Sequence, residues 1–440
     1  MKIHCTLDPR TDKVLALLIA ALWAAITLFS YLNSWAPDLS AIYFAGHFYG
    51  LEAYDQVYAS PVGFFGPDNA PAWQAAMDAL GRGDESYFPF VYPPIWAALA
   101  APLAHAVDPI TFFNIFLVAH ILMMSAAVFL SYRIAKPSFP LAWWAGGAFL
   151  LLFGSLPSVH ALMMNQPQIT VVFLAILAME RVVAGKSIQA GAALGLAAAI
   201  KLTPIFLVLV FLLRCDWRAI IAFALTSGSL GLASFAIAGP ELHWIFLEKL
   251  GIISDQIAVI KVNYAVENLV YQVGTLLSGH QIGSEFPITQ FPIAEPGWVS
   301  VVTRAAFVAV LALIVTVSLR LDRDDQMRIA PVALMLAASM FGPLAWAHHY
   351  LFAILLLPTL FVIYPLRPAV FGVTSVFVLT TTPVFSVLDM VSIHIHIHMI
   401  VGVLVMGSVL TAFLAAPAFR RNAHDTPNPQ NVSEPQTAQA

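Results

Sequence analysis

Long apolar segments with almost no charges recur along the whole chain, and they restrict the fold more than any other feature. An apolar run of about 18 or more residues is long enough to cross a bilayer as a helix. Such runs begin at Val14 and recur to about residue 417, and only 10% of the 440 residues are charged. A water-soluble surface alone needs roughly a quarter to a third charged residues. The sequence therefore predicts an all-α, polytopic membrane protein.

We expect about 11–13 transmembrane or re-entrant helices. The run from Val14 is too long for a signal-peptide core, so we interpret it as a retained signal anchor. If segment 91–107 crosses the membrane fully, Arg133 and Lys136 lie outside, against the positive-inside rule. Either this segment is re-entrant or a further short span is missing from the set of candidate spans. The candidate spans are 14–32, 91–107, 110–132, 140–156, 168–183, 187–213, 219–238, 299–319, 329–345, 350–364, 369–387 and 399–417.

Charge distribution predicts the orientation. Most basic residues stand at span ends that can share one side, whereas segments 34–89 and 239–297 are rich in acids. The positive-inside rule therefore makes those two segments long outer loops and places both termini in the cytoplasm. This predicts a cytoplasmic N-terminus (1–13), one transmembrane domain (14–418) and a disordered, polar cytoplasmic tail (419–440) in the cell's inner (plasma) membrane. Nucleic acid is an unlikely partner because the net charge is −4 and no basic patch occurs.

Lys201 interrupts an apolar segment that begins near residue 187 and ends at Arg214. Basic residues at both ends, Lys186 and Arg214, indicate that both ends face the cytoplasm. A broken helical hairpin fits, with Pro204 ending the geometry of the first arm and Lys201 raised toward the outer side. A single long span is the alternative, and it would leave an ammonium group near the middle of the membrane. In the hairpin, Lys201 either reaches the interface or binds an anion such as a phosphate.

Asp38 follows Pro37 at the exit of the first span, before an aromatic-rich stretch that can form a helix. An acid at this place is a typical helix N-cap, which is the favoured local interpretation. A carboxylate held at the outer membrane surface can also accept a proton from a hydroxyl group. The two roles are compatible.

His348 and His349 stand at the predicted outer end of a span, in the stretch "FGPLAWAHHYLFAI". Adjacent side chains on a helix point about 100° apart, so the pair cannot easily chelate one metal ion. One histidine can face a polar cavity while the other packs. The alternative is an interfacial belt formed together with Trp346 and Tyr350.

Amide side chains gather in two outer regions. Asn165 and Gln166 lie in "MMNQPQI", and Asn268 lies in "VENLVYQVG". Amides suit the hydroxyl groups of a sugar, and they suit ordinary hydrogen bonding in loops equally well.

A run of alternating histidines, "SIHIHIHM", is the nearest approach to a metal motif. On a strand, His394, His396 and His398 would share one face and could bind a metal ion, but a short outer loop makes this the less favoured interpretation. The outer loops contain no Asp-x-Asp cluster. We therefore expect no metal and no other cofactor.

Several stretches, in this order, resemble glycosyltransferase family 87, which contains polyprenol-phosphate-mannose-dependent alpha-mannosyltransferases and related arabinosyltransferases with the GT-C fold. The resemblance covers about residues 14 to 365, and the chain departs from the Asn-x-Ser-type pattern of many members where it reads "ENLVYQVG". The stretches are "PDLSAIYFAGHFYGLEAYDQVY", "FVYPPIWAALAAPLA", "NQPQITVVFLAILAMERVVAGKSIQAGAALGLAAAIKLTPIFLVLVFLLR" and "PLAWAHHYLFAILL".

The resemblance implies an inverting transfer of a sugar, mannose by default, from a polyprenyl-phosphate donor to a lipid or glycan acceptor on the periplasmic side. By position, Asp38 would be the general base, His348 or His349 would contact the donor phosphate, and Lys201 would help to neutralise it. Asn165, Gln166 and Asn268 are candidate contacts for the sugar or the acceptor. An arabinofuranosyltransferase with the same mechanism, a flippase for polyprenyl-linked sugars and a non-catalytic membrane subunit are the alternatives.

Overall fold

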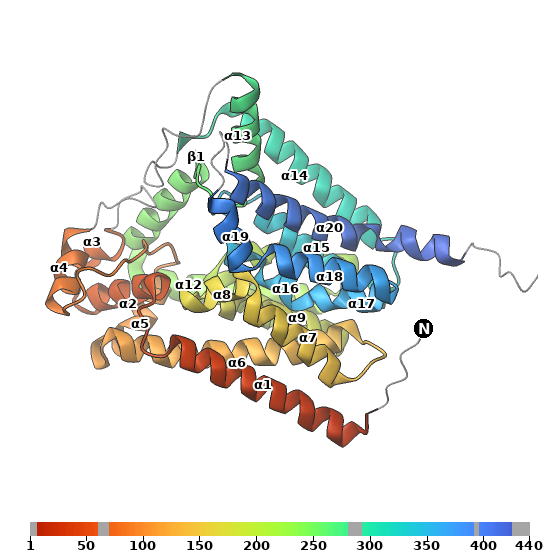
Figure 1. The fold of residues 1–440 in the computed structure, drawn as a ribbon. Coiled ribbons are helices and arrows are strands. Elements are labelled where there is room, and N and C mark those ends of the chain that lie inside the picture. Colours follow the sequence, from red (N-terminus) through yellow and green to blue (C-terminus); the bar gives the residue numbers. More distant parts are fainter. Residues whose placement is uncertain (1–6, 60–69, 280–292, 391–395, 425–440) are drawn as a thin grey trace, which may run out of the picture.

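A computed structural model of the chain shows an almost entirely helical molecule (Figure 1). The structure describes residues 7–59, 70–279, 293–390 and 396–424. Among these residues, 5 helices are long and apolar enough to cross a membrane, which confirms an all-α, polytopic membrane protein. They are α1 (Pro9–Tyr31), α6 (Pro109–Ala135), α12 (Trp217–Ser254), α14 (Gly297–Ser318) and the apolar part of α20 (Ile397–His424).

The other α-helices of the described residues are shorter. They are α2 (Pro37–Gly50), α3 (Tyr54–Val57), α4 (Pro71–Ala79), α5 (Ile95–Ala106), α7 (Leu141–Gly154), α8 (Leu156–Met163), α9 (Gln168–Val183), α10 (Ser187–Ile200), α11 (Val208–Leu213), α13 (Val266–Leu277), α15 (Arg323–Met340), α16 (Leu351–Leu356), α17 (Leu360–Ile363), α18 (Leu366–Leu379) and α19 (Thr382–Asp389). The described part of the chain also has three 3-10 helices: η1 (Thr203–Leu207), η2 (Ala347–Tyr350) and η3 (Leu357–Thr359). One short antiparallel ladder joins β1 (Gln256–Ile257) to β2 (Ile293–Ala294).

The ends of the helices sort into two faces of the bundle. The start of α1 and the end of α20 lie at one end in Figure 1, and helices α2 to α5 lie at the opposite end. At that second end, the backbone amide of Asn33 donates to Oδ1 of Asn114 over 2.9 Å, which joins the end of α1 to the start of α6. Helices α1 and α6 therefore cross the bundle in opposite directions.

Helix α5 settles the alternative left open for segment 91–107. It has 12 residues, too few at about 1.5 Å per residue to cross a hydrocarbon layer of about 30 Å. It packs against α2 instead, and Asp108 caps α6 at the same end of the bundle. The prediction of a full span at 91–107 is therefore wrong. Without that span, Arg133 and Lys136 lie on the same side as the other basic residues.

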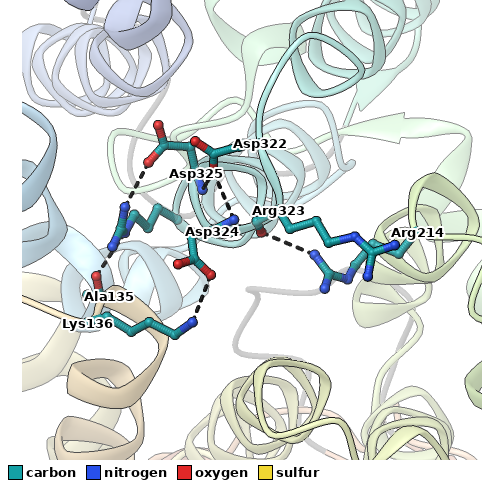
Figure 2. A network of polar contacts seen from close by, with 8 residues as sticks. Ala135, Lys136, Arg214, Asp322, Arg323, Asp324 and Asp325 are labelled. Atoms are coloured by element: carbon teal, nitrogen blue, oxygen red, sulfur yellow. Dashed lines mark hydrogen bonds and ion pairs between the residues drawn. The ribbon is translucent and has the colours of Figure 1, made fainter.

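A polar network at the opposite end of the bundle confirms this grouping of charges (Figure 2). Lys136, just after α6, pairs with Asp324 of α15 over 2.7 Å. Arg328 donates to the carbonyl oxygen of Ala135 and pairs with Asp325, each over 2.8 Å. Arg214, at the end of α11, donates to the backbone oxygen of Arg323 over 3.1 Å. The ends of α6, α11 and α15 are thus joined at one face.

Segment 187–213 is a broken hairpin, as the sequence predicts. The hydroxyl of Ser187, at its start, donates to Asp216, just beyond its end, over 2.7 Å. Helix α10 stops at Ile200, and the chain returns through η1 and α11. Lys201 is extended, with φ −147° and ψ 134°, so it lies at the turn of the hairpin, far from both ends.

Several predicted boundaries are wrong. Helix α12 continues past residue 238 into the predicted loop, with a kink at Gly239 where φ is 75° and Pro240 follows. The predicted span 369–387 is divided into α18 and α19 by extended backbone at Thr381. Helix α20 continues to His424, so residues 419–424 are helical, whereas the rest of the predicted tail lies outside the described residues.

Candidate active site

Asp38 lies in the first turn of α2 and faces another part of the chain. The N-cap of α2 is Ala36, Pro37 is the first helical residue, and no side chain caps the helix. The N-cap interpretation of Asp38 is therefore wrong, because its carboxylate is used elsewhere. Its Oδ2 accepts a hydrogen bond of 2.5 Å from the side-chain amide of Gln166, in the turn that follows α8.

The surroundings of Asp38 suit proton transfer near neutral pH. Burial raises the pKa of this carboxyl group to about 6, although the hydrogen bond from Gln166 and the positive charge of Lys201 act in the opposite direction. A carboxyl group with this pKa is mostly ionised at pH 7 and is a stronger base than an exposed aspartate. Both properties are required of a general base.

Gln166 is held on both sides. Its Oε1 accepts from the hydroxyl of Tyr92 over 3.2 Å while its nitrogen donates to Asp38. The preceding residue, Asn165, has φ 48° and bonds through its side chain to Nδ1 of His120 (2.7 Å) and to the backbone oxygen of Phe113 (2.8 Å). Asn165 thus fixes the turn that presents Gln166, and neither amide points freely into a sugar site. Sequence reasoning missed Tyr92, although it stands in the quoted stretch "FVYPPIW".

Lys201 and His349 form the second element of the site. The ammonium group of Lys201 lies 2.7 Å from Nε2 of His349, and Nδ1 of His349 lies 3.0 Å from the carbonyl oxygen of Leu344. A carbonyl only accepts hydrogen bonds, so Nδ1 carries the proton and Nε2 accepts from Lys201. Both nitrogens of His349 are therefore used, and this residue positions Lys201.

His348 points in a different direction. Its ring is nearly perpendicular to that of His349, at 87°, and nearly parallel to that of His160, with centroids 5.8 Å apart. Only 2% of its surface is exposed, which rules out the interfacial belt for His348. Its Nε2 is buried without a hydrogen-bond partner in the described part of the chain. This nitrogen is therefore available to a hydrogen-bonding group of a ligand.

Asn268 is not part of the cluster formed by Asp38, Lys201 and the two histidines, and its hydrogen bonds are to neighbouring residues of its own predicted loop. It is fully buried, and its nitrogen donates to the backbone oxygens of Ile260 and Asn263, each over 2.9 Å. Its Oδ1 accepts from Gln272 over 2.8 Å. Asn263 in turn accepts from the backbone amide of Ala345 over 2.9 Å, three residues before His348. This amide cluster therefore supports the segment that carries the two histidines.

Among the alternating histidines, His396 and His398 do not lie on a common strand. His394 lies outside the described residues, and α20 begins at Ile397, so His398 is helical. The two described members have different neighbours: His396 bonds with Gln272 over 3.1 Å, and His398 bonds with the hydroxyl of Tyr264 over 2.8 Å. The described ranges contain no group of three or more residues arranged to hold a metal ion.

The structure thus brings together a carboxylate, an ammonium group and a buried imidazole from parts of the chain far apart in sequence. The positive charge of Lys201 acts on the pKa of Asp38, so the carboxylate and the ammonium group belong to one site. A cation beside a base can stabilise a leaving anion while the base takes a proton from the attacking group.

Two comparisons with known proteins bear on this arrangement. The family model described as glycosyltransferase family 87 matches residues 90–347, more than half of the chain. The chain is 29% identical over 295 residues to the polyprenol-phosphate-mannose-dependent alpha-(1-2)-phosphatidylinositol mannoside mannosyltransferase of Mycolicibacterium smegmatis. This alignment covers 62% of the chain and 61% of the relative, less than two thirds of the relative's length. The family match includes Gln166 and Lys201 and ends one residue before His348.

Proposed function

The chain belongs to glycosyltransferase family 87, and on that premise we propose that this membrane glycosyltransferase moves mannose from a polyprenyl-phosphate donor to a lipid- or glycan-linked acceptor. We place the reaction on the outer, periplasmic face of the inner membrane, where the acid-rich loops are predicted. The relative from Mycolicibacterium smegmatis is named for a polyprenol-phosphate-mannose donor and a phosphatidylinositol mannoside acceptor. For this chain, the donor sugar and the acceptor class are proposals.

In the proposed reaction, Asp38 acts as the general base. A hydroxyl oxygen of the acceptor attacks the anomeric carbon of the donor sugar, and its proton passes to the Asp38 carboxylate. The bond between the anomeric carbon and the phosphate oxygen breaks, and the electron pair leaves with the polyprenyl phosphate. Attack opposite the leaving group inverts the anomeric configuration. A positioned base of this kind typically contributes about 10²–10⁴-fold to the rate.

The leaving phosphate gains charge as its bond to the sugar breaks. We assign Lys201 to balance that charge and His348 to donate a hydrogen bond through its unpaired Nε2. His349 supports the site indirectly, because it orients the ammonium group of Lys201. Asn165 and Gln166 position Asp38 in this proposal, and Asn268 maintains the fold.

The observation that carries the proposal is the pairing of Asp38 and Lys201 within one site. The charge of Lys201 influences Asp38. Asp38 accepts a hydrogen bond from Gln166, and Lys201 donates one to His349, and both partners lie far away in the sequence. A base on the acceptor side and a cation on the leaving-group side are what glycosyl transfer from a phosphate requires. We also propose that no metal takes part, since Lys201 and His348 provide the electrophilic groups; transfer should therefore persist in a chelator.

The decisive experiment uses purified protein in lipid with radiolabelled polyprenyl-phosphate mannose and a membrane-lipid extract. Label should appear in a new product with the wild type and with Asp55→Asn, a matched change of an exposed acid in the same outer loop. It should fall to background with Asp38→Asn while donor binding persists. Equal transfer by Asp38→Asn and wild type would refute the role of the base.

The remaining alternatives predict different results in the same assay. Transfer from a polyprenyl-phosphate arabinofuranose, but not from the mannose donor, would keep the mechanism and change the sugar. Movement of labelled lipid between leaflets without any new product would favour a flippase.

A further inference from the structure

His160 and His348 form a pair of histidines, and the proposed function assigns no role to His160. His160 lies on α8 and His348 on η2, and their rings are almost parallel, with an interplanar angle of 9°. The Nδ1 atoms of the two rings face each other at 3.5 Å. His160 also lines a cavity of about 140 Å³ together with Tyr264, Ala347 and Phe385.

Only one proton fits between the two Nδ1 atoms of a neutral pair. Lys201 already brings a positive charge to this site, so a further charge on His348 would be unfavourable. If His160 carries the shared proton, Nδ1 of His348 accepts it and the proton of His348 resides on Nε2. If His348 carries it on Nδ1, Nε2 of His348 is unprotonated and can only accept a hydrogen bond.

A phosphate selects between these two arrangements. Phosphate oxygens are acceptors, so the buried Nε2 of His348 must carry a proton to bind one. His349 cannot take over this task, because its Nε2 accepts from Lys201. The protonation of the pair therefore decides whether the site contains a neutral donor for the phosphate.

We propose that His160 is a positioning residue that donates through Nδ1 to His348 and so holds His348 as the Nε2–H tautomer for the donor phosphate. This inference rests on the proposed function, because the phosphate is that of the polyprenyl-phosphate sugar. His160 acts through His348 and does not itself touch the phosphate. The device resembles the way in which a second hydrogen bond fixes the tautomer of a metal-binding or catalytic histidine.

The first test compares two replacements of His160. His160→Asn keeps a nitrogen donor, whereas His160→Leu keeps an apolar side chain of similar reach without one. His160→Leu should lower kcat/KM for the donor by about 10–100-fold, the range expected for a hydrogen bond to a charged group. The KM for the acceptor should stay within about twofold, and His160→Asn should recover most of the loss. His243→Asn, a change of a histidine that bonds within α12 to Ser234 and Gly239, should behave like the wild type.

A double-mutant cycle separates positioning from structural damage. In a His348→Leu background, His160→Leu should cause no further loss of kcat/KM, since its effect passes through His348. An equal loss in both backgrounds would overturn the proposal, and so would a failure of His160→Asn to rescue.

Nitrogen-15 spectra of histidine-labelled protein test the tautomer without any transfer reaction. The signal of His348, identified by its disappearance in His348→Leu, should show a protonated Nε2 in wild type and His160→Asn and a mixed population in His160→Leu. A protonated Nδ1 in the wild type bound to polyprenyl phosphate would overturn the inference. Absence of transfer from every donor together with the expected spectra would count against the proposed function alone.

Discussion

The side-chain amide of Gln166 donates a hydrogen bond to Oδ2 of Asp38 over 2.5 Å and thereby joins residues that are 128 positions apart. The same amide accepts from the hydroxyl of Tyr92, so it cannot turn away without breaking that second contact. Gln166 stabilises the ionised form of Asp38, which lowers the pKa of a carboxyl group that burial raises. This contact makes Gln166 the residue through which the basicity of the site can be adjusted.

Replacing Gln166 should therefore move the pH dependence of transfer. Asp38 must be ionised to accept a proton, and its pKa is about 6, so activity should rise with pH through that value and level off above it. Gln166→Leu removes the stabilising hydrogen bond and raises the pKa of Asp38. The acidic limb of the kcat/KM profile should shift to higher pH, with a several-fold loss at pH 6.5 and a smaller loss at pH 8.

The control for this profile is Gln189→Leu, because Gln189 contacts Arg181 near the other end of the bundle. Its profile should match that of the wild type. A Gln166→Leu enzyme that is uniformly slower at all pH values would show that Gln166 supports the fold or the substrate and does not tune Asp38.

Lys201 and His349 should behave as one unit toward the phosphate. Lys201→Met removes the positive charge, and we expect the affinity for polyprenyl phosphate to fall by about 10–100-fold. His349→Leu removes only the group that orients Lys201 and should cause a smaller loss. The double variant should bind no worse than Lys201→Met, as measured by titration of the protein in nanodiscs. Additive losses would instead give His349 a phosphate contact of its own.

The sequence predicts the parts of the site that follow from charge and chain geometry. Asp38 follows Pro37 at the end of a span, and Lys201 precedes Pro204 in an apolar segment. A charged side chain at such a place in a membrane is costly unless it faces a polar site or a partner. The broken hairpin follows from basic residues at its two ends, and the structure has it. The N-cap interpretation of Asp38 is wrong because the residues next to Asp38 in the sequence do not show that the distant Gln166 donates a hydrogen bond to its carboxylate.

Pairing between distant residues is what the sequence could not supply. His349 meets Lys201 across 148 positions, and His160 meets His348 across 188. These pairs depend on how several helices pack against one another. A local sequence pattern indicates only which face of a single helix is apolar. Asn268 is a further example, because its amide can form the same hydrogen bonds with a sugar as with buried backbone groups. The sequence alone does not distinguish these two environments.

Asn268 should matter for stability more than for binding. Asn268→Ala leaves the backbone oxygens of Ile260 and Asn263 buried without their donor, a change that typically costs about 1–3 kcal/mol. Thermal unfolding in detergent should occur at a lower temperature, while the KM for the acceptor in the folded fraction stays close to that of the wild type. A raised acceptor KM with unchanged unfolding would mean that Asn268 contacts the acceptor after all.

Glu267 should make stability depend on pH in the direction opposite to an ordinary surface acid. Only 8% of it is exposed, and its Oε1 has no hydrogen-bond partner within the described ranges. Burial and the nearby charge of Glu295 raise the pKa of Glu267 to about 9 from an ordinary value of 4.5, although Arg304 acts in the opposite direction. Between those two values the folded protein holds a proton that the unfolded chain has released. Stability should therefore fall as pH rises through this window, by up to about 1.4 kcal/mol per unit.

Glu267→Gln keeps the shape of the side chain and removes its titration. The unfolding temperature of this variant should exceed that of the wild type at pH 8 and approach it near pH 4.5, so the pH dependence becomes flatter. Glu241→Gln, a change of an exposed acid in the same predicted outer loop, should leave the wild-type slope intact. Equal slopes for wild type and Glu267→Gln would show that Glu267 is ionised in the folded protein. Its carboxylate would then require a cationic partner, and Arg304 is the candidate because its charge already lowers the pKa of Glu267.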